Sequence, residues 1–127
     1  GTTVGEKAKI GNFVELKNTS FGPGSKANHL SYLGDATIGA DVNVGAGTLS
    51  SHYERVNKNR TVLEDKAFIG SDSPTVAPVT IGRGALIAAG ATITKNVPPD
   101  ALGISRAKQE NREGFAAARR KMRGKDK

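Results

Sequence analysis

The stretch from Leu63 to Val97, LEDKAFIGSDSPTVAPVTIGRGALIAAGATITKNV, decides the fold because mostly aliphatic residues recur in it at every sixth position. This series consists of Leu63, Ile69, Thr75, Ile81, Ile87 and Ile93. A second series of smaller residues runs four places behind it, at Ala67, Ser73, Val79, Ala85, Ala91 and Val97. An amphipathic helix needs an apolar period of about 3.6 residues and a half-buried strand needs strict alternation, so neither template fits. A period of six indicates one short strand and one corner per repeat.

The same spacing continues through the N-terminal part, at Val4, Ile10 and Leu16. Two five-residue steps, Leu16 to Phe21 and Leu33 to Ile38, shift its register. Gly often follows the large apolar residue, where the chain must turn sharply. We therefore predict an all-β solenoid over residues 1–100, a left-handed parallel β-helix of hexapeptide repeats. The alternative, a flexible Gly-rich linker, does not explain the aliphatic spacing.

Two segments interrupt the repeat. Residues 49–60 are too polar for regular coils, and we interpret them as a projecting loop of the kind that often carries a binding site. At Val97-Pro98-Pro99-Asp100, two prolines end strand pairing and the chain leaves the solenoid. Residues 101–127 are predicted to form a C-terminal extension that is partly helical or disordered, with the helix from about Gln109 to Met122 and disorder in the last residues.

Composition excludes several classes of protein. The 127 residues contain no Cys, so neither a disulfide framework nor a thiolate site is available. No apolar run approaches the roughly 20 residues needed to span a bilayer, and no signal peptide opens the chain. We expect a cytoplasmic protein with no membrane partner. Because Gly1 falls within a repeat, we expect these residues to be part of a longer chain.

Most of the net charge of +7 lies at the C-terminal end. From Arg106 to Lys127 there are nine basic residues and three acidic ones. Such a tail is usually a solvated chain end. Binding of nucleic acid by this tail is the least favoured alternative, because aromatic residues that could stack on bases make up only 5% of the chain. It would predict a salt-sensitive affinity that disappears when residues 107–127 are deleted.

Only two histidines are present, His29 and His52. A histidine side chain changes its protonation near neutral pH and can therefore remove a proton from a substrate. Zinc enzymes built on this kind of solenoid use three imidazoles for each metal ion. We therefore expect no metal site.

Three stretches of the sequence resemble a known family. They are Ile10–Lys17 (IGNFVELK), Gly24–Ala36 (GSKANHLSYLGDA) and Asn43–Thr48 (NVGAGT). They are similar to the C-terminal acetyltransferase domain of bifunctional bacterial N-acetylglucosamine-1-phosphate uridyltransferase/glucosamine-1-phosphate acetyltransferase, the GlmU family. The resemblance covers residues 4 to about 106 and no part of the uridyltransferase domain.

The resemblance implies transfer of an acetyl group from acetyl-CoA to the amine of glucosamine-1-phosphate, a step in UDP-N-acetylglucosamine and cell-wall biosynthesis. His29 matches the general base of the family, and the transfer is direct. The positions that match sugar-phosphate ligands are Lys17, Tyr32, Asn43 and Lys58. The positions that match acetyl-CoA ligands are Ala46, Tyr53, Ser71, Ala89 and Arg106. His52 stands where the family has an Asn that binds the coenzyme.

The family also implies a homotrimer with active sites between its subunits, in which Arg106 serves a neighbouring site. Two alternatives stay open besides the nucleic-acid binder. One is another hexapeptide-repeat acyltransferase acting on a different amine or hydroxyl group. The other is a catalytically idle trimeric scaffold.

Overall fold

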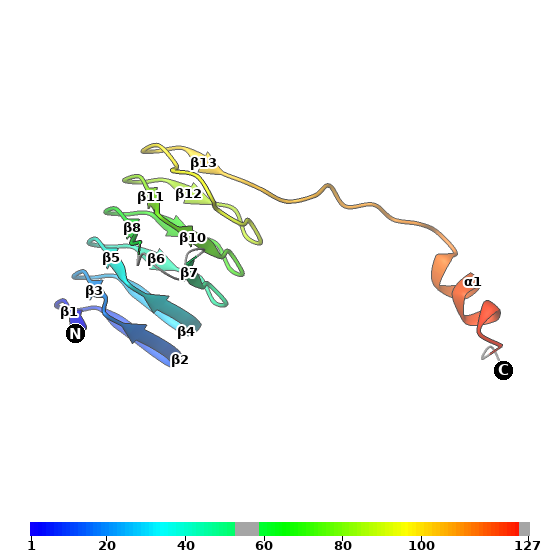
Figure 1. Cartoon of the computed structure of the whole chain (residues 1–127), viewed down its shortest axis with the longest axis horizontal. Coiled ribbons are helices and arrows are strands. Elements are labelled where there is room, and N and C mark those ends of the chain that lie inside the picture. Colours follow the sequence, from blue (N-terminus) through cyan, green and yellow to red (C-terminus); the bar gives the residue numbers. More distant parts are fainter. Residues whose placement is uncertain (53–58, 125–127) are drawn as a thin grey trace.

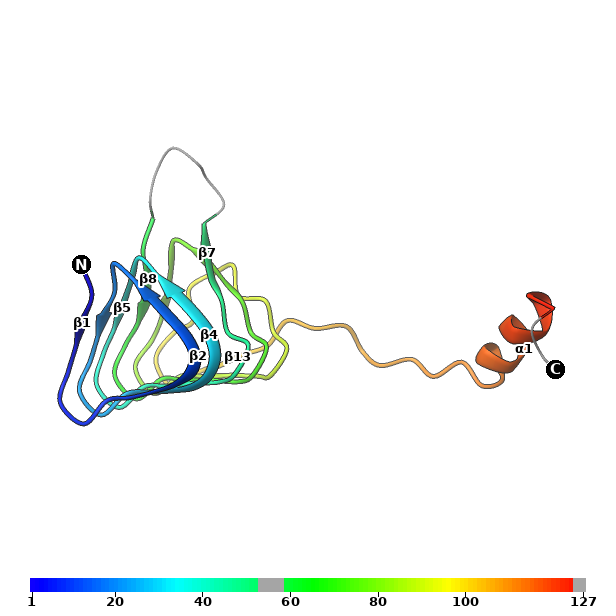
Figure 2. The ribbon, with the colours of Figure 1, turned by 90° about the horizontal axis from the view of Figure 1, so that it is seen from below.

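The computed structural model describes residues 1–52 and 59–124, and it confirms the parallel β-helix (Figure 1). Short strands stack coil upon coil, and all of the strand pairs are parallel. Figure 2 looks along the stack and shows a triangular outline with three flat faces. An extended segment then leads away from the solenoid to the single helix of the described chain, α1 (Phe115–Met122).

Three faces make up the prism. Face 1 consists of the first halves of β2 (Lys9–Lys17) and β4 (Lys26–Gly34), followed by β6 (Asn43–Val44), β9 (Phe68–Ile69), β12 (Leu86–Ile87) and β13 (Leu102–Gly103). Face 2 consists of the second halves of β2 and β4, followed by β7 (Ser50–His52) and β10 (Thr75–Ala77). Face 3 consists of β1 (Thr3–Val4), β3 (Ser20–Phe21), β5 (Ala36–Ile38), β8 (Thr61–Leu63) and β11 (Val79–Ile81).

The two residue series found in the sequence fill the interior of the prism. Ile69, Ile81 and Ile87 are at most 1% exposed, and the Ala residues of the second series are equally buried. Glycine at the corners allows close stacking of the coils, because a Cβ on Gly45 would lie 2.6 Å from the backbone nitrogen of Ser71. The five-residue step from Leu16 to Phe21 shortens the corner between these two residues, and Asn18 takes a left-handed φ of 48° there.

The ends of three predicted segments differ from the structure. Ser50–His52 pairs with β10, so the first part of the predicted loop 49–60 is a strand, and Thr48 and Ser50 point inward and are buried. Pro98 and Pro99 lie in a turn that needs no ladder N–H, and β13 still pairs with β12 after them. The helix begins at Phe115 rather than Gln109, directly after Gly114 at φ 76°. No helix in the described residues is long and apolar enough to cross a membrane.

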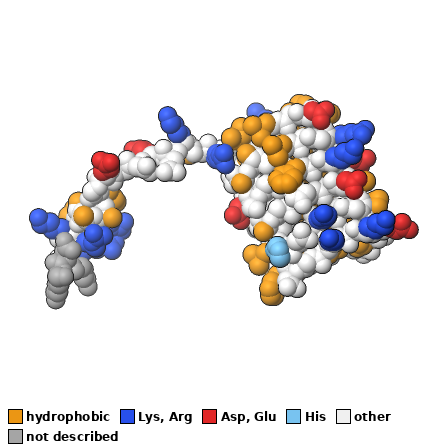
Figure 3. Space-filling view, turned by 180° about the vertical axis from the view of Figure 1, so that it is seen from behind, with side chains coloured by type: hydrophobic (Ala, Val, Ile, Leu, Met, Phe, Trp, Pro, Cys, Tyr) orange, Lys and Arg blue, Asp and Glu red, His pale blue; other side chains and the backbone are white. Residues whose placement is uncertain are grey.

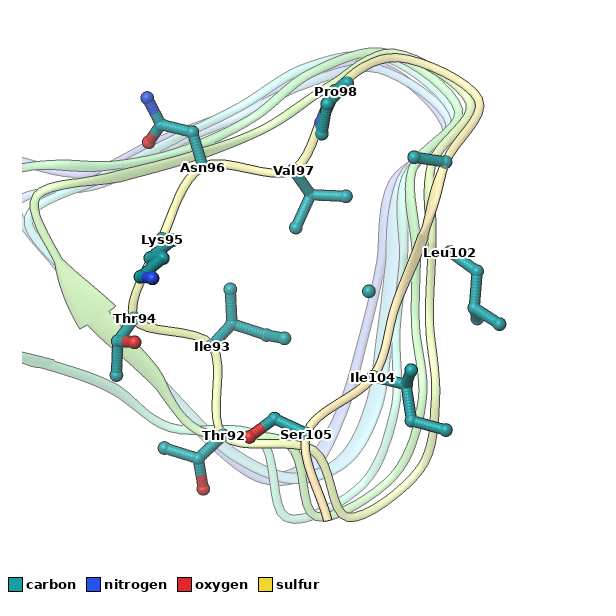
Figure 4. Close-up of a pocket in the computed structure, with 12 residues that line it drawn as sticks. Thr92, Ile93, Thr94, Lys95, Asn96, Val97, Pro98, Leu102, Ile104 and Ser105 are labelled. Atoms are coloured by element: carbon teal, nitrogen blue, oxygen red, sulfur yellow. The ribbon is translucent and has the colours of Figure 1, made fainter.

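The C-terminal end of the core forms a pocket of about 510 Å³ (Figure 4). Ile93 and Val97 point into the space enclosed by the last coil, whereas Leu102 and Ile104 point outward. Gly103 occupies the inward position of this coil, and a Cβ there would lie 2.7 Å from the Ile87 side chain. None of the residues that line this pocket is a predicted site residue, so we regard it as the end of the core.

Ile81→Ala is expected to lower the free energy of unfolding by about 2–5 kcal/mol. The Ile81 side chain is fully buried, and neighbouring coils hold its surroundings in place, so truncation leaves a cavity. The matched control is Thr80→Ala in the same strand, which alters an outward-facing side chain and should change stability by about 0.5 kcal/mol or less. Urea unfolding at a fixed protein concentration measures both. Equal losses in the two variants would contradict the packing described here.

Candidate active site

The corner between faces 1 and 2, here called the 1–2 corner, aligns four predicted site residues along the solenoid. The amide of Asp72 donates to the carbonyl oxygen of Ala46 at 2.8 Å, and the amide of Gly90 donates to that of Ser71 at 2.8 Å. These bonds hold successive coils in register, and His29 occupies the same corner two coils before Ser71. His29, Ala46, Ser71 and Ala89 therefore form one row.

His29 lies in β4 opposite Asn12 of β2, and its side chain is exposed. The Ser31 hydroxyl donates to the backbone oxygen of His29 at 3.0 Å and so braces the strand beside it. The imidazole has no hydrogen-bond partner among the described residues. Both of its ring nitrogens are therefore available to a ligand.

A groove of about 620 Å³ follows the 1–2 corner and the adjoining part of face 1. Four of the predicted site residues line it: Asn43, Ser71, Ala89 and Arg106. The Arg106 guanidinium donates from Nη1 to the carbonyl oxygen of Ala89 at 2.8 Å, which anchors the arginine at the C-terminal end of the groove. The structure thus brings one predicted acceptor residue and three predicted coenzyme residues into a single groove.

Lys17 and Tyr32 lie elsewhere on the prism. Lys17 ends β2 at the corner between faces 2 and 3, and its side chain is exposed. Tyr32 is half-buried on face 2, where its hydroxyl occupies the space that a Cβ on Gly34 would need. Tyr32 also lines a hollow of about 360 Å³ on this face. Within one chain, the predicted sugar-phosphate residues that the structure describes, Lys17, Tyr32 and Asn43, are therefore divided between two faces.

Three predicted site residues lie wholly or partly outside the described structure. Tyr53 and Lys58 fall outside the described residues, and His52 is described only as the last backbone position of β7. In the described part of the chain, no group of three or more His, Cys, Asp or Glu residues could hold a metal ion.

Sequence reasoning did not identify the apolar wall of the groove. Phe68, Leu86 and Leu102 are 47%, 47% and 57% exposed, and all three line it. Figure 3 shows hydrophobic side chains gathered on the solenoid next to the point where the tail leaves it. The sequence does contain a signal for this wall. Each of these three residues directly precedes an inward-facing residue and therefore points outward, where a solvent-exposed coil would carry a polar side chain.

Comparisons with known proteins agree with this architecture. The model of a family described as the hexapeptide repeat of succinyl-transferase matches residues 60–95. The chain is 60% identical to the bifunctional protein GlmU of Geotalea daltonii over 115 residues, which are 91% of this chain and 25% of the relative. It is 59% identical to the bifunctional protein GlmU of Geotalea uraniireducens over the same shares of the two chains. The chain thus spans about a quarter of the length of these curated relatives.

Among solved structures, the chain resembles the hexapeptide-repeat acetyltransferase VCA0836 of Vibrio cholerae in its complex with acetyl-CoA. The TM-score is 0.71 at 24% sequence identity, and the match covers 78% of this chain and 63% of the other. At this identity the likeness concerns the fold.

Proposed function

Because the chain is homologous over nearly its whole length to about a quarter of the bifunctional protein GlmU, we propose that it acetylates the amine of glucosamine-1-phosphate with acetyl-CoA. One observation carries the proposal. A single groove runs along the 1–2 corner and contains Asn43, Ser71, Ala89 and Arg106. Its row of small side chains continues toward an exposed imidazole at His29.

The shape and charge of the groove suit an extended coenzyme. Ala46, Ser71 and Ala89 have short side chains, so the pantetheine arm can lie close to the backbone of successive coils. Arg106 supplies a permanent positive charge at the far end, where it can pair with a phosphate group. The apolar residues Phe68, Leu86 and Leu102 bound the groove on face 1. In the proposed binding mode, the thioester end of acetyl-CoA lies toward His29.

Acetyl transfer then needs one base. The amine nitrogen of the sugar attacks the thioester carbonyl carbon, and the imidazole of His29 takes the proton that this nitrogen loses. The tetrahedral intermediate collapses, the carbon–sulfur bond breaks, and the thiolate of CoA leaves and is protonated. No acyl-enzyme is required, in keeping with a chain that contains no cysteine. The products are N-acetylglucosamine-1-phosphate and CoA.

The split between the two faces supports a trimer with shared sites. His29 and Asn43 belong to the 1–2 corner and face 1, whereas Lys17 and Tyr32 belong to face 2 and its far corner. These two groups of side chains point away from different surfaces of the same rigid prism. An acceptor that contacts both Lys17, at the far corner of face 2, and Asn43, on face 1, needs a second copy to supply one of them. We therefore propose that each site of a homotrimer combines residues from two copies.

Release of the CoA thiol, followed with three acceptors, tests the proposal. Glucosamine-1-phosphate should be acetylated with a kcat/KM at least about tenfold above that of glucosamine, since a charge-assisted hydrogen bond from a lysine to the phosphate contributes about 1.5–3 kcal/mol. Serine should give no more release than the buffer control. A preference for serine would favour a different acyltransferase, and the absence of turnover with every amine would favour a scaffold.

A further inference from the structure

The outward residues of face 1 change character along the solenoid. In successive coils they are Lys9, Lys26, Asn43, Phe68, Leu86 and Leu102, which the strand register aligns in one column. Lys9 and Lys26 are direct partners, so like charges lie on neighbouring strands about 4.8 Å apart. Neither lysine forms an ion pair with any described residue. Directly opposed like charges destabilise a sheet, so this pair has a cost within one chain.

Face 2 carries the complementary charge at the same level of the stack. Its outward column begins with Glu15 and continues through Tyr32 and Leu49. Glu15 is exposed, lines the 360 Å³ hollow of this face and has no ion-pair partner among the described residues. The same hollow is lined by Leu49, which is 49% exposed, and by Leu30 of the 1–2 corner, which is 60% exposed. In its first coil, face 2 thus carries the carboxylate of Glu15 at its centre and Lys17 at its far corner, and the outward column is apolar at Leu49.

A threefold axis parallel to the solenoid brings equal coils together. Rotation about such an axis moves a coil around the axis without moving it along the stack, so the first coils of two copies lie at the same height. A ring of three needs two different surfaces that meet head to tail, because the same patch cannot face itself in a cyclic trimer. Face 1 together with the 1–2 corner is one such surface, and face 2 is the other.

We propose that Lys9 and Lys26 of one copy pair with Glu15 of the next copy, and that this contact sets the register of the trimer. The inference rests on the trimeric assembly put forward under the proposed function and deepens it by naming the contact surfaces. The pairing neutralises the stacked lysines and brings the apolar half of face 1 against Leu49 and its neighbours. A slip that carries Glu15 beyond Lys26, or one coil below Lys9, would separate the charges.

Charge reversal tests the contact. Glu15→Lys is expected to raise the concentration at which trimers dissociate by at least about tenfold, because three attractive contacts per trimer become repulsive. The variant Lys9→Glu/Lys26→Glu should weaken assembly similarly. The chain that carries all three reversals should recover most of the loss. Glu6→Lys is the matched control, since this exposed residue lies between faces 3 and 1 and undergoes the same change of charge. Sedimentation equilibrium measures the dissociation, and circular dichroism verifies the fold.

The outcomes separate this inference from the proposed function. If Glu15→Lys assembles as well as Glu6→Lys, or if the triple reversal recovers nothing, the register contact is wrong even when acetyl transfer occurs. If the reversals behave as expected and no acceptor is acetylated, the contact stands and the proposed activity fails. A parent chain that sediments as a monomer at every concentration overturns the contact as well.

Discussion

His29→Ala is expected to lower kcat for acetyl transfer to glucosamine-1-phosphate by about 10²–10⁴-fold, the usual contribution of a positioned general base. The side chain is exposed and makes no hydrogen bond to the rest of the described chain, so its removal should leave the free energy of unfolding nearly unchanged. Initial rates at saturating acetyl-CoA, together with urea unfolding, measure the two quantities.

Asn12→Ala is the control for His29→Ala, because Asn12 is the strand partner of His29 and is also exposed. A small effect of Asn12→Ala beside a large effect of His29→Ala would assign the loss to the imidazole and not to the corner as a whole. A His29→Ala variant with an unchanged kcat would remove the proposed base and, with it, the mechanism.

Mixed trimers of His29→Ala and Lys17→Ala chains are expected to regain about one third of the parent activity, although each variant alone is nearly inactive. The two residues lie at different corners of the prism, and the proposed site takes one from each of two copies. A trimer that contains both kinds of chain has two copies of one variant and one copy of the other, so about one of its three sites receives an intact His29 and an intact Lys17. Co-expression of the two chains with different tags, followed by purification through both tags, yields the mixed trimers.

A mixture of His29→Ala and Asn43→Ala chains is the control. His29 and Asn43 lie on the same side of the prism, so the same copy supplies both to a given site. Each site in this mixture lacks one of them, and activity should not return. Restoration here, or none in the His29→Ala and Lys17→Ala mixture, would show that the site is divided differently.

The sequence predicted the core residues of this protein more accurately than the residues at which its loop and its helix begin and end. Ile69, Ile81 and Ile87 were identified as core residues from their spacing alone. Each face of each coil has an equivalent inward-facing position, so an apolar residue recurs every six residues. The limits of the loop and helix were less accurate. Leu49 to His52 looked polar, yet Ser50 points inward and its hydroxyl donates to the carbonyl oxygen of Gly34 at 3.1 Å, which satisfies a buried polar group. A local pattern does not contain such a contact between residues 16 positions apart.

The sequence by itself determined the solenoid and, through its resemblance to a known family, suggested a list of site residues. Only the tertiary structure decided which outward side chains share a surface. Lys9, Lys26, Asn43 and Phe68 occupy one column, although the last step between them is 25 residues and the two before it are 17. The reason is physical: shortened corners and the segment before Arg60 change the number of residues in individual coils, while the hydrogen bonds between coils keep the faces aligned. The division of the site between two faces, and the placement of Lys26 and Glu15 on adjoining faces, follow from that alignment.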